Sequence, residues 1–394
     1  MARTTYSALK TIGVSYDLSL IIHAAIIAGG MGAVWYMEHY GHIVTGMGNK
    51  IVWGVPHVFA IFLIIAASGA LNVASISSVF SKKPYKPFAR LSALLALSLL
   101  IGGLAVLVLD LGRPDRLIIA MTTYNFKSVF AWNIFLYTGF MAIGAIYLYT
   151  LMARNMRRYS APIGFLAFVW RLVLTAGTGS IFGFIIARSA YDSALFAPLF
   201  IASSFVYGLA FTVLILNIAQ QSSQSTIIDA EMIRKFRTLL LVFTASVLLI
   251  TVIFHLTKLY TTRHHPVETF LLASDNVYTL TFWAGQIAIG IILPIILMAI
   301  WHKSININKL SWISGLLLLG GIAQLYVIII GGQAYPIELF PGMEVSSSFR
   351  DGEIISYTPS LAEVLLGISG ISIAMLLSGI LLRIMPFLPK GETA

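Results

Sequence analysis

The chain has 394 residues, of which 58% are hydrophobic and only 10% are charged, and its mean hydropathy is +0.90. A soluble globular domain carries about a quarter charged residues, so this composition excludes one and indicates a polytopic membrane protein. The formal net charge of +10 does not require a nucleic-acid partner, because basic residues in a membrane protein usually record its orientation.

Ten apolar runs follow one another along the chain, each about as long as a helix that crosses about 30 Å of hydrocarbon. They cover approximately residues 11–36, 52–80, 88–110, 127–151, 161–187, 195–220, 234–259, 277–301, 308–331 and 359–387. We therefore expect an all-α integral membrane fold of ten transmembrane helices. The short polar start runs into the first span without a small-residue cleavage site, so we expect an uncleaved first helix.

The distribution of basic residues predicts the orientation. If the N-terminus lies inside, the inner segments hold sixteen Lys and Arg and the outer segments hold eight. This bias and the even number of spans predict that both termini are cytoplasmic, in a bacterial or archaeal cytoplasmic membrane. The long outer loops, at about 37–51, 111–126, 260–276 and 332–358, hold most of the aromatic, His and acidic residues outside the spans. The outer face is therefore the expected docking or reaction side.

Two parts of the sequence resemble each other at an offset of about 150 residues. Residues 86–90 open a span that ends at Asp110, and residues 234–237 open one that ends near residues 255–258. The likeness favours one polytopic domain, residues 1–394, of two parallel four-helix units and a closing helix pair. The expected units are residues 1–151, 161–302 and 308–387. Chance similarity between apolar helices is the alternative.

Ionisable side chains within spans are functional candidates, because charge is costly in hydrocarbon. They are Asp17, His23, His57, Asp110, Arg171, His255 and Glu363. Structural roles compete with functional ones: Asp17 and Arg171 would form an ion pair between helices, and Glu363 would be favoured by the dipole of its helix. The structural alternative for Asp110 is that it caps the outer end of its helix and pairs with Arg113.

His57 has the strongest case, since it starts a helix near the outer surface, one turn after Trp53. A quinone head group requires hydrogen-bond donors, a titratable group, aromatic walls and an apolar slot for its tail. The residues expected at the same level are Asp110, Tyr124, Asn125, Lys127, Trp132 and Asn133. We expect no metal, haem or iron–sulfur cluster in this chain, because it has no Cys and its span His residues lie at different depths.

One segment has a specific signature. Residues 109–116 (LDLGRPDR) follow the span opened by residues 86–90 and precede residues 125–128 (NFKS) and 130–133 (FAWN). This arrangement resembles the NrfD/PsrC family of quinone-interacting membrane subunits, and within it the DsrP-type subunits of DsrMKJOP sulfur-metabolism complexes. Trp53 departs from the family pattern, since some members carry Asn there.

The resemblance implies a subunit of an oxidoreductase complex that binds menaquinone or ubiquinone near the periplasmic face. It also implies partners: a docked ferredoxin-like iron–sulfur subunit, a multihaem cytochrome c, and further membrane and cytoplasmic Dsr-type subunits. His57 would exchange a proton with one quinone oxygen, and Asp110, held by Arg113, would relay protons. The aromatic walls would be Trp53, Tyr124 and Trp132, and the other cofactor-binding residues would be Asn125, Lys127 and Asn133.

Two other functions remain open. The first is an ion- or proton-translocating, transporter-like subunit, with or without redox coupling. Its path would use the interior groups Asp17, His23, Arg171, His255 and Glu363. The second is a passive anchor for the outer electron-transfer subunits, which predicts no bound quinone.

Overall fold

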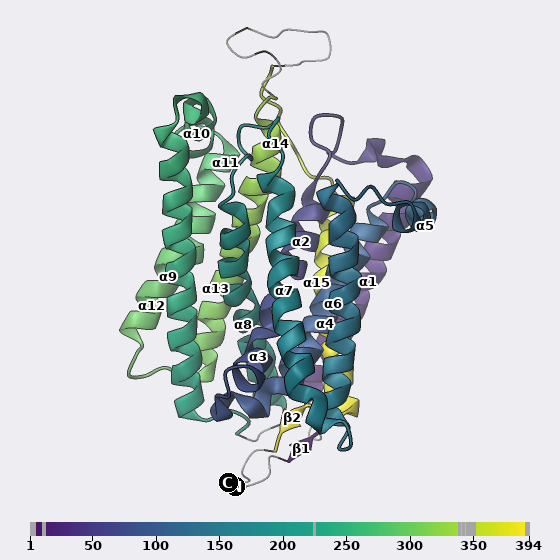
Figure 1. Cartoon of the computed structure of the whole chain (residues 1–394), viewed down its shortest axis with the longest axis vertical. Helices are drawn as coiled ribbons and strands as arrows, with labels where there is room; N and C mark the ends of the chain where they lie inside the picture. Colours follow the sequence, from purple (N-terminus) through teal and green to yellow (C-terminus); the bar gives the residue numbers. More distant parts are fainter. Residues whose placement is uncertain are drawn as a thin grey trace.

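The computed structural model describes residues 5–9, 13–223, 226–337, 340, 343 and 352–390. Ten helical spans lie side by side in these residues, which confirms the expected all-α membrane fold (Figure 1). The spans are α1 (Val14–Tyr40); α2 (Val55–Ala70) with α3 (Asn72–Ser78); η2 (Lys83–Phe88) with α4 (Ala89–Leu109); α6 (Val129–Met152); η4 (Arg157–Tyr159) with α7 (Ser160–Gly183); α8 (Phe196–Ser223); α9 (Ala230–Tyr260); α11 (Val277–Leu280), η6 (Thr281–Ile292) and α12 (Leu293–Ile300); α13 (Ile307–Tyr326), η7 (Val327–Gly331) and α14 (Gly332–Ala334); and α15 (Leu361–Ile384).

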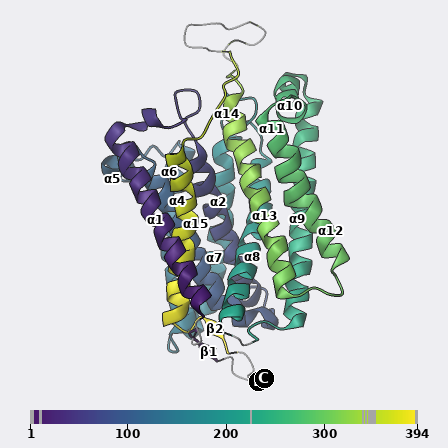
Figure 2. The same ribbon diagram turned by 180° about the vertical axis from the view of Figure 1, so that it is seen from behind.

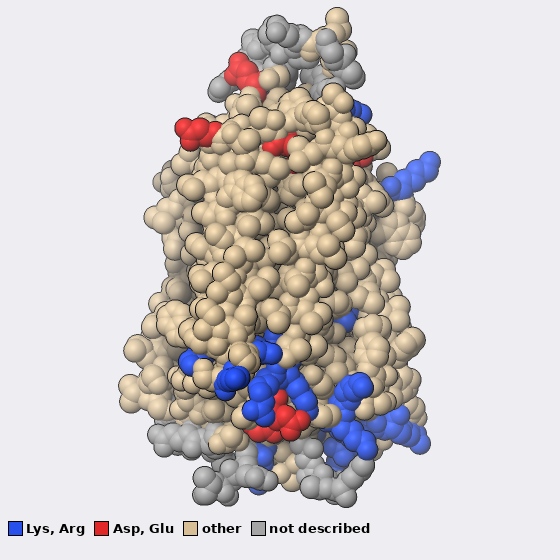
Figure 3. Space-filling model, turned by 90° about the vertical axis from the view of Figure 1, so that its left-hand side faces the viewer, with Lys and Arg blue, Asp and Glu red and all other residues tan. Residues whose placement is uncertain are grey.

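The two ends of the helix bundle differ. At one end, called the terminal end here, the short strands β1 (Tyr6–Ser7) and β2 (Leu388–Pro389) pair antiparallel. The opposite end, called the loop end, carries η1 (His42–Val44), η3 (Pro114–Arg116), α5 (Leu117–Thr122), η5 (Thr262–His264) and α10 (His265–Leu272) (Figures 1 and 2). On the face shown in Figure 3, Lys and Arg gather at the terminal end, below a broad middle band almost without charge.

Contacts between spans define two four-helix bundles. In the first bundle, α2 packs on α4, α4 on α6, and α6 on α7, which returns to α2. In the second, α8 packs on α9, α9 on η6 and α12, and η6 on α13, which returns to α8. The first bundle thus contains spans two to five and the second contains spans six to nine.

The first and last spans pack together outside these bundles. Helix α1 lies along α15, and α15 lies along α4 and α2 (Figure 2). These contacts do not follow the grouping expected from the sequence, which placed the first span in the first unit and paired the last two spans. The first and last spans pack together because helices in a membrane associate by close packing, which chain order does not determine.

The two bundles meet along α2 and α8, which are the most buried spans. In the most apolar stretch of each helix, 89% of residues in the second span and 83% in the sixth are buried, against 17% in the first. Gly69 of α2 and Gly208 of α8 allow the two backbones to touch: a Cβ on Gly69 would lie 1.5 Å from the carbonyl oxygen of Ser204. Small residues at such crossings are typical of membrane helix packing.

Candidate functional site

A cluster of His57, Asp110 and His42 lies at the loop end of the first bundle. Pro56 at the first turn of α2 places His57 there, and Asp110 is the C-cap of α4, so the two antiparallel helices bring both residues to one level. His57 Nδ1 lies 3.0 Å from Asp110 Oδ2. His42 Nε2, from η1, lies 2.9 Å from the backbone oxygen of Asp110 and 3.8 Å from its Oδ1.

The cluster is buried and has unused hydrogen-bonding capacity. The side chain of Asp110 is 1% exposed and that of His57 is 17% exposed. The contact between them is close but not aligned as a hydrogen bond, and no hydrogen bond from another described residue reaches His57 Nδ1 or either Asp110 carboxylate oxygen. Buried polar atoms without partners are rare because they cost free energy. These atoms therefore suit a ligand that both donates and accepts hydrogen bonds.

Trp53 is fixed beside this cluster by the end of the ninth span. Its backbone N–H donates to Gln333 Oε1 at 3.0 Å, and its carbonyl accepts from Gln333 Nε2 at 2.9 Å. The indole packs against Phe130 and Phe182, with ring centroids 5.9 and 5.7 Å apart. Gln333 and Phe182 were not expected at the site, because they are distant in sequence from Trp53 and belong to no motif.

Glu363 holds the segment that leads into α2. Its Oε2 accepts hydrogen bonds from the backbone N–H groups of Gly46 and Ser360, at 2.8 and 2.7 Å, and its Oε1 accepts one from the Tyr357 hydroxyl at 2.6 Å. Burial raises the pKa of the Tyr357 hydroxyl, and the bond to Glu363 raises it further. A Cβ on Gly54 would lie 2.4 Å from Glu363 Oε1, so only glycine permits this approach. The contacts give Glu363 a structural role, as a capping-box residue of α15.

Arg113 does not hold Asp110, which corrects that expectation. Its guanidinium donates to both carboxylate oxygens of Asp115, at 3.0 and 2.9 Å, and both side chains are well exposed. The hydrogen bonds from Arg113 hold the pKa of Asp115 below its usual value. Asp115 lies on the exposed turn η3, only two residues from Arg113, whereas the Asp110 carboxylate faces the interior and meets the two histidines.

The other expected wall residues form a separate aromatic cluster. Tyr124 stacks on Phe135 with centroids 4.3 Å apart, and Trp132 packs on Phe126 and Phe135. Trp132 is 50% exposed, and its indole N–H donates to the Phe126 carbonyl. The ring contacts that the described residues show for Trp53 include neither Tyr124 nor Trp132. The expected aromatic walls are therefore divided between two groups of rings, one around Trp53 and one around Phe135.

The polar residues of the same segment are already bonded locally. Asn125 Oδ1 accepts from the backbone N–H of Lys127 at 3.0 Å, and both residues are exposed. Asn133 is buried, and its amide nitrogen donates to the carbonyl oxygens of Val129 and Gly177, at 2.9 and 3.2 Å. Asn133 thereby ties α6 to α7, and a ligand would have to displace one of these bonds.

The interior charges have partners that the sequence did not predict. Asp17 pairs with Arg383 at 2.9 Å, with both side chains about half exposed, so the expected Asp17–Arg171 pair is wrong. Arg171 is fully buried and donates to Asn72 Oδ1 at 3.0 Å. His23 Nδ1 lies 3.3 Å from the Ser372 hydroxyl.

A second His–carboxylate pair lies at the loop end of the second bundle. His255 Nδ1, in the last turns of α9, is 2.7 Å from Glu268 Oε2 of α10, and the Glu268 side chain is 1% exposed. The sequence indicated His255 as a candidate but not its partner, because Glu268 lies in a loop segment. Among the residues that the structure describes, no group of three His, Asp or Glu side chains could hold a metal ion.

Comparisons with known proteins agree with this architecture. The family model described as "Polysulphide reductase, NrfD" matches residues 43–337, which contain spans two to nine and thus both bundles. The chain is 28% identical over 382 residues to the Hdr-like menaquinol oxidoreductase integral membrane subunit of Archaeoglobus fulgidus, covering 96% of this chain and 95% of that protein. It is 25% identical over 393 residues to the C subunit of selenate reductase from Mesobacillus selenatarsenatis, covering 89% and 90%. It is 24% identical over 310 residues to the C subunit of polysulfide reductase from Wolinella succinogenes, covering 73% and 96%. Because the family match spans most of the sequence, the chain belongs to the polysulphide reductase NrfD family.

Proposed function

We propose that this protein is the quinone-reactive membrane subunit of an oxidoreductase complex, and that the quinone or quinol head group binds beside His57 and Asp110. Family membership supports the first part, and a relative that covers nearly the whole chain is named as a menaquinol oxidoreductase subunit. The observation that carries the second part is the buried His57–Asp110 contact at 3.0 Å, whose hydrogen-bonding capacity is unused.

The donor set fits a quinol. A quinol hydroxyl donates a hydrogen bond and a quinone carbonyl accepts one, and imidazole does either according to its protonation. Trp53, packed on Phe130 and Phe182, offers an aromatic wall beside the imidazole. When bound, a quinol supplies two electrons and two protons, and both must leave the site for its oxidation to go to completion.

Three residues of the chain would then transfer the proton in sequence. His57 accepts the proton of one quinol hydroxyl, and the Asp110 carboxylate, 3.0 Å from the imidazole, stabilises the imidazolium that forms. His42, whose side chain is 28% exposed, connects Asp110 to the surface of the loop end and offers the proton an exit. In the reverse direction the same groups return a proton to the reduced ring.

The electrons pass to or from an iron–sulfur subunit that docks on the loop end. His57 and Asp110 lie at the loop end. An iron–sulfur cluster in a partner docked there would therefore be near the quinone ring. We propose that the loop end faces the periplasm, because Lys and Arg gather at the opposite, terminal end (Figure 3). The quinone type, a sulfur-metabolism role and the Dsr-type and cytochrome partners stay predictions.

Substitution of His57 by Ala tests the proposal. In the purified complex, we expect quinol-dependent reduction of the iron–sulfur clusters to fall at least about 100-fold, as loss of a general base does, while the subunits still assemble. The matched control is His39→Ala, which removes an exposed imidazole from the loop end of α1. Unchanged turnover in His57→Ala would refute the assignment, as would the absence of quinone from the purified wild-type complex, which the passive-anchor alternative predicts.

The alternative path through Asp17, Arg171 and Glu363 stays a prediction without support from the contacts. Asp17 is paired with Arg383 at the terminal end, and both oxygens of Glu363 accept structural hydrogen bonds. Arg171 contacts Phe168 and Phe205 with its guanidinium, which separates it from both acids. A proton path is better supported by polar groups of the second bundle, which contains none of these three residues.

A further inference from the structure

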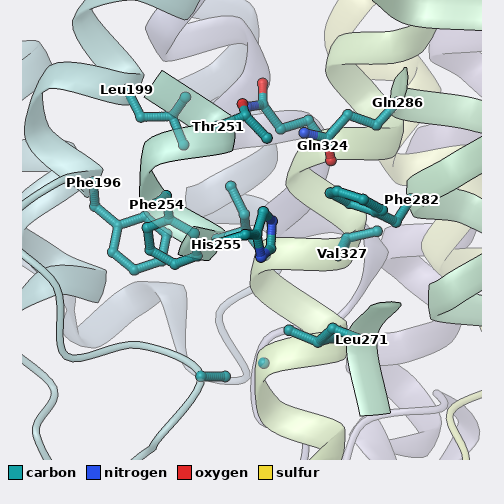
Figure 4. Close-up of a pocket in the computed structure, with 13 residues that line it drawn as sticks. Phe196, Leu199, Thr251, Phe254, His255, Leu271, Phe282, Gln286, Gln324 and Val327 are labelled. Carbon is teal, nitrogen blue, oxygen red and sulfur yellow. The ribbon is translucent and has the colours of Figure 1, made fainter. Parts of the chain in front are cut away.

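The second bundle contains a cavity that the quinone proposal does not use. It lies between α8, α9, η6 and α13, with His255 in its lining, and is walled mostly by aromatic and aliphatic side chains (Figure 4). A second cavity continues from it towards the middle of the bundle and ends at Thr244 and Tyr207. Gln286 and Gln324 line both cavities, so the two cavities meet at these side chains.

Two threonines of α9 that line these cavities have no hydrogen-bond partner among the described residues. Buried threonines in helices ordinarily donate to the carbonyl four residues earlier, and Thr175 and Thr212 do so here, each at 2.8 Å. Thr244 and Thr251 are equally buried, yet no hydrogen bond within the described ranges reaches their hydroxyls. An unused hydroxyl in an apolar setting costs free energy that a water molecule would recover.

Gln324 presents a donor to the same space. Its Oε1 accepts hydrogen bonds from the Ser203 and Tyr207 hydroxyls, at 3.2 and 2.5 Å, which fixes the amide so that its nitrogen points away from them. This Nε2 is buried without an acceptor among the described residues. In Figure 4 Gln324 lies between Thr251 and Gln286, on one side of His255. A water molecule there would accept from Gln324 and donate to a threonine.

The helices around the cavities are locally widened. Residues 281–292 of the eighth span and residues 327–331 of the ninth form π-helix, where each turn holds an extra residue. Gln286 lies within the first of these segments and Gln324 lies three residues before the second. Such turns are uncommon and occur frequently at functional sites, so two of them beside one line of polar groups point to a function.

The polar groups form a line about half the thickness of the membrane. Thr244, Thr251 and His255 share one face of α9, and the 11 residue-to-residue steps from first to last rise about 16 Å along the helix axis. The hydrocarbon core is about 30 Å thick. The line therefore runs from the loop end to near the membrane middle.

We infer that this line is a water-filled path that carries protons between the loop end and the middle of the membrane, with the His255–Glu268 pair at its mouth. Water is the occupant because the upper cavity has room for about two water molecules and the lower for about one, too little for a quinone ring. The ordered waters bridge Thr244, Thr251, Gln286 and Gln324. The path is separate from the His57–Asp110 cluster and does not depend on quinone binding there.

Single cysteines test whether water reaches these positions. The native chain has no Cys, so each substitution adds the only thiol of this subunit. The assembled complex is exposed from the loop end to Ag⁺, a probe small enough for a narrow aqueous path, and the free thiol that remains is measured by a maleimide mass tag after denaturation. We expect Thr251→Cys and Thr244→Cys to react at least ten times faster than Leu240→Cys and Leu249→Cys. Leu240 of α9 is fully buried, and Leu249 of the same helix is 60% exposed on its outer side, so they control for dry burial and for lipid exposure.

Three outcomes would overturn the inference. Thr244→Cys reacting no faster than Leu240→Cys would mean that the line is dry. Reaction only from the terminal end would reverse the direction of the path. Protection of Thr251→Cys by a soluble quinone analogue would mean that the cavity binds quinone. His57→Ala leaves the Ag⁺ reactivity of Thr251→Cys unchanged if the path is independent of the proposed quinone site.

A second measurement tests the proton role. The whole complex in proteoliposomes oxidises quinol, and the number of protons released per electron is measured with a pH-sensitive dye. We expect Thr251→Val combined with Gln324→Met to lower this ratio by at least half, while turnover with an uncoupler stays at the wild-type rate. If the double variant released as many protons per electron as the wild type, the proton role would be wrong. It would also be wrong if the wild type released no more protons than quinol oxidation itself produces. Loss of uncoupled turnover would assign the cavity to the redox reaction instead.

Discussion

The contact between the two bundles makes a prediction that can be worked from the coordinates. In Gly69→Ala the new Cβ would lie 1.5 Å from the Ser204 carbonyl oxygen and 2.4 Å from its carbon, whereas ordinary contacts begin near 3.4 Å. The obstacle is backbone, so it has no rotamer by which to swing away, and α2 and α8 must separate by about 2 Å. Overpacking that side chains absorb costs about 1–3 kcal/mol, and here we expect a loss of at least about 3 kcal/mol.

The assay is thermal unfolding of the purified protein in detergent, with Gly29→Ala as the matched control. A Cβ on Gly29, in α1, would meet nothing within 4 Å. The control should therefore unfold at the wild-type temperature or slightly above it, because Ala favours helix by about 0.5–1 kcal/mol. If Gly69→Ala and Gly29→Ala unfolded at the same temperature, α2 and α8 would not touch as the structure shows.

Three further predictions concern the charges of the interior. Glu363→Gln replaces one of two acceptor oxygens by a donor, so thermal unfolding should show a loss of about 1–3 kcal/mol; an unchanged midpoint would contradict the hydrogen bonds that Glu363 accepts from Gly46 and Tyr357. Asp17→Asn removes a half-exposed ion pair, so stability should change by less than about 1 kcal/mol and quinol turnover should not change; a loss of proton release in this variant would revive the interior charge path. Arg171→Met together with Asn72→Leu replaces a buried charge and its neutral hydrogen-bond partner by apolar groups and should unfold no earlier than the wild type, whereas a large drop in the midpoint would indicate that the guanidinium binds something essential.

The sequence predicted the spans well, because hydrocarbon thickness fixes the length of an apolar run and backbone hydrogen bonding forces it into a helix. It also predicted that His57 and Asp110 reach one level, since one starts the second span and the other ends the third. The structure places them 3.0 Å apart. Chain order was sufficient to predict this pair, because the start of one span and the end of the next, antiparallel span lie at the same side of the membrane.

Partners from distant parts of the chain could not be predicted in this way. Gln333 fixes Trp53 from 280 residues away, and Arg383 pairs with Asp17 across 366 residues. The sequence shows which side chains can donate or accept hydrogen bonds, but it does not show which helices are neighbours. If one helix is assigned the wrong neighbour, the partners predicted for its side chains are wrong as well. The predicted contact between Arg113 and Asp110 was wrong for a different reason. Asp115 is the acid nearest to Arg113 in the sequence, and an exposed ion pair forms more readily than one that requires burial.

The two bundles share a scaffold but place their His–carboxylate pairs differently. Asp110 and His255 lie near the ends of corresponding spans, so the acid of one bundle stands where the other has the imidazole. The partner of Asp110 comes from α2, the preceding span of the bundle, whereas the partner of His255 comes from α10, an added helix at the loop end. Of these two pairs, the second lies above a cavity in which buried threonine and glutamine side chains lack partners among the described residues. The two pairs therefore lie at the same end of the molecule in different surroundings, which is what we expect if the first binds the quinone and the second begins a separate path for protons.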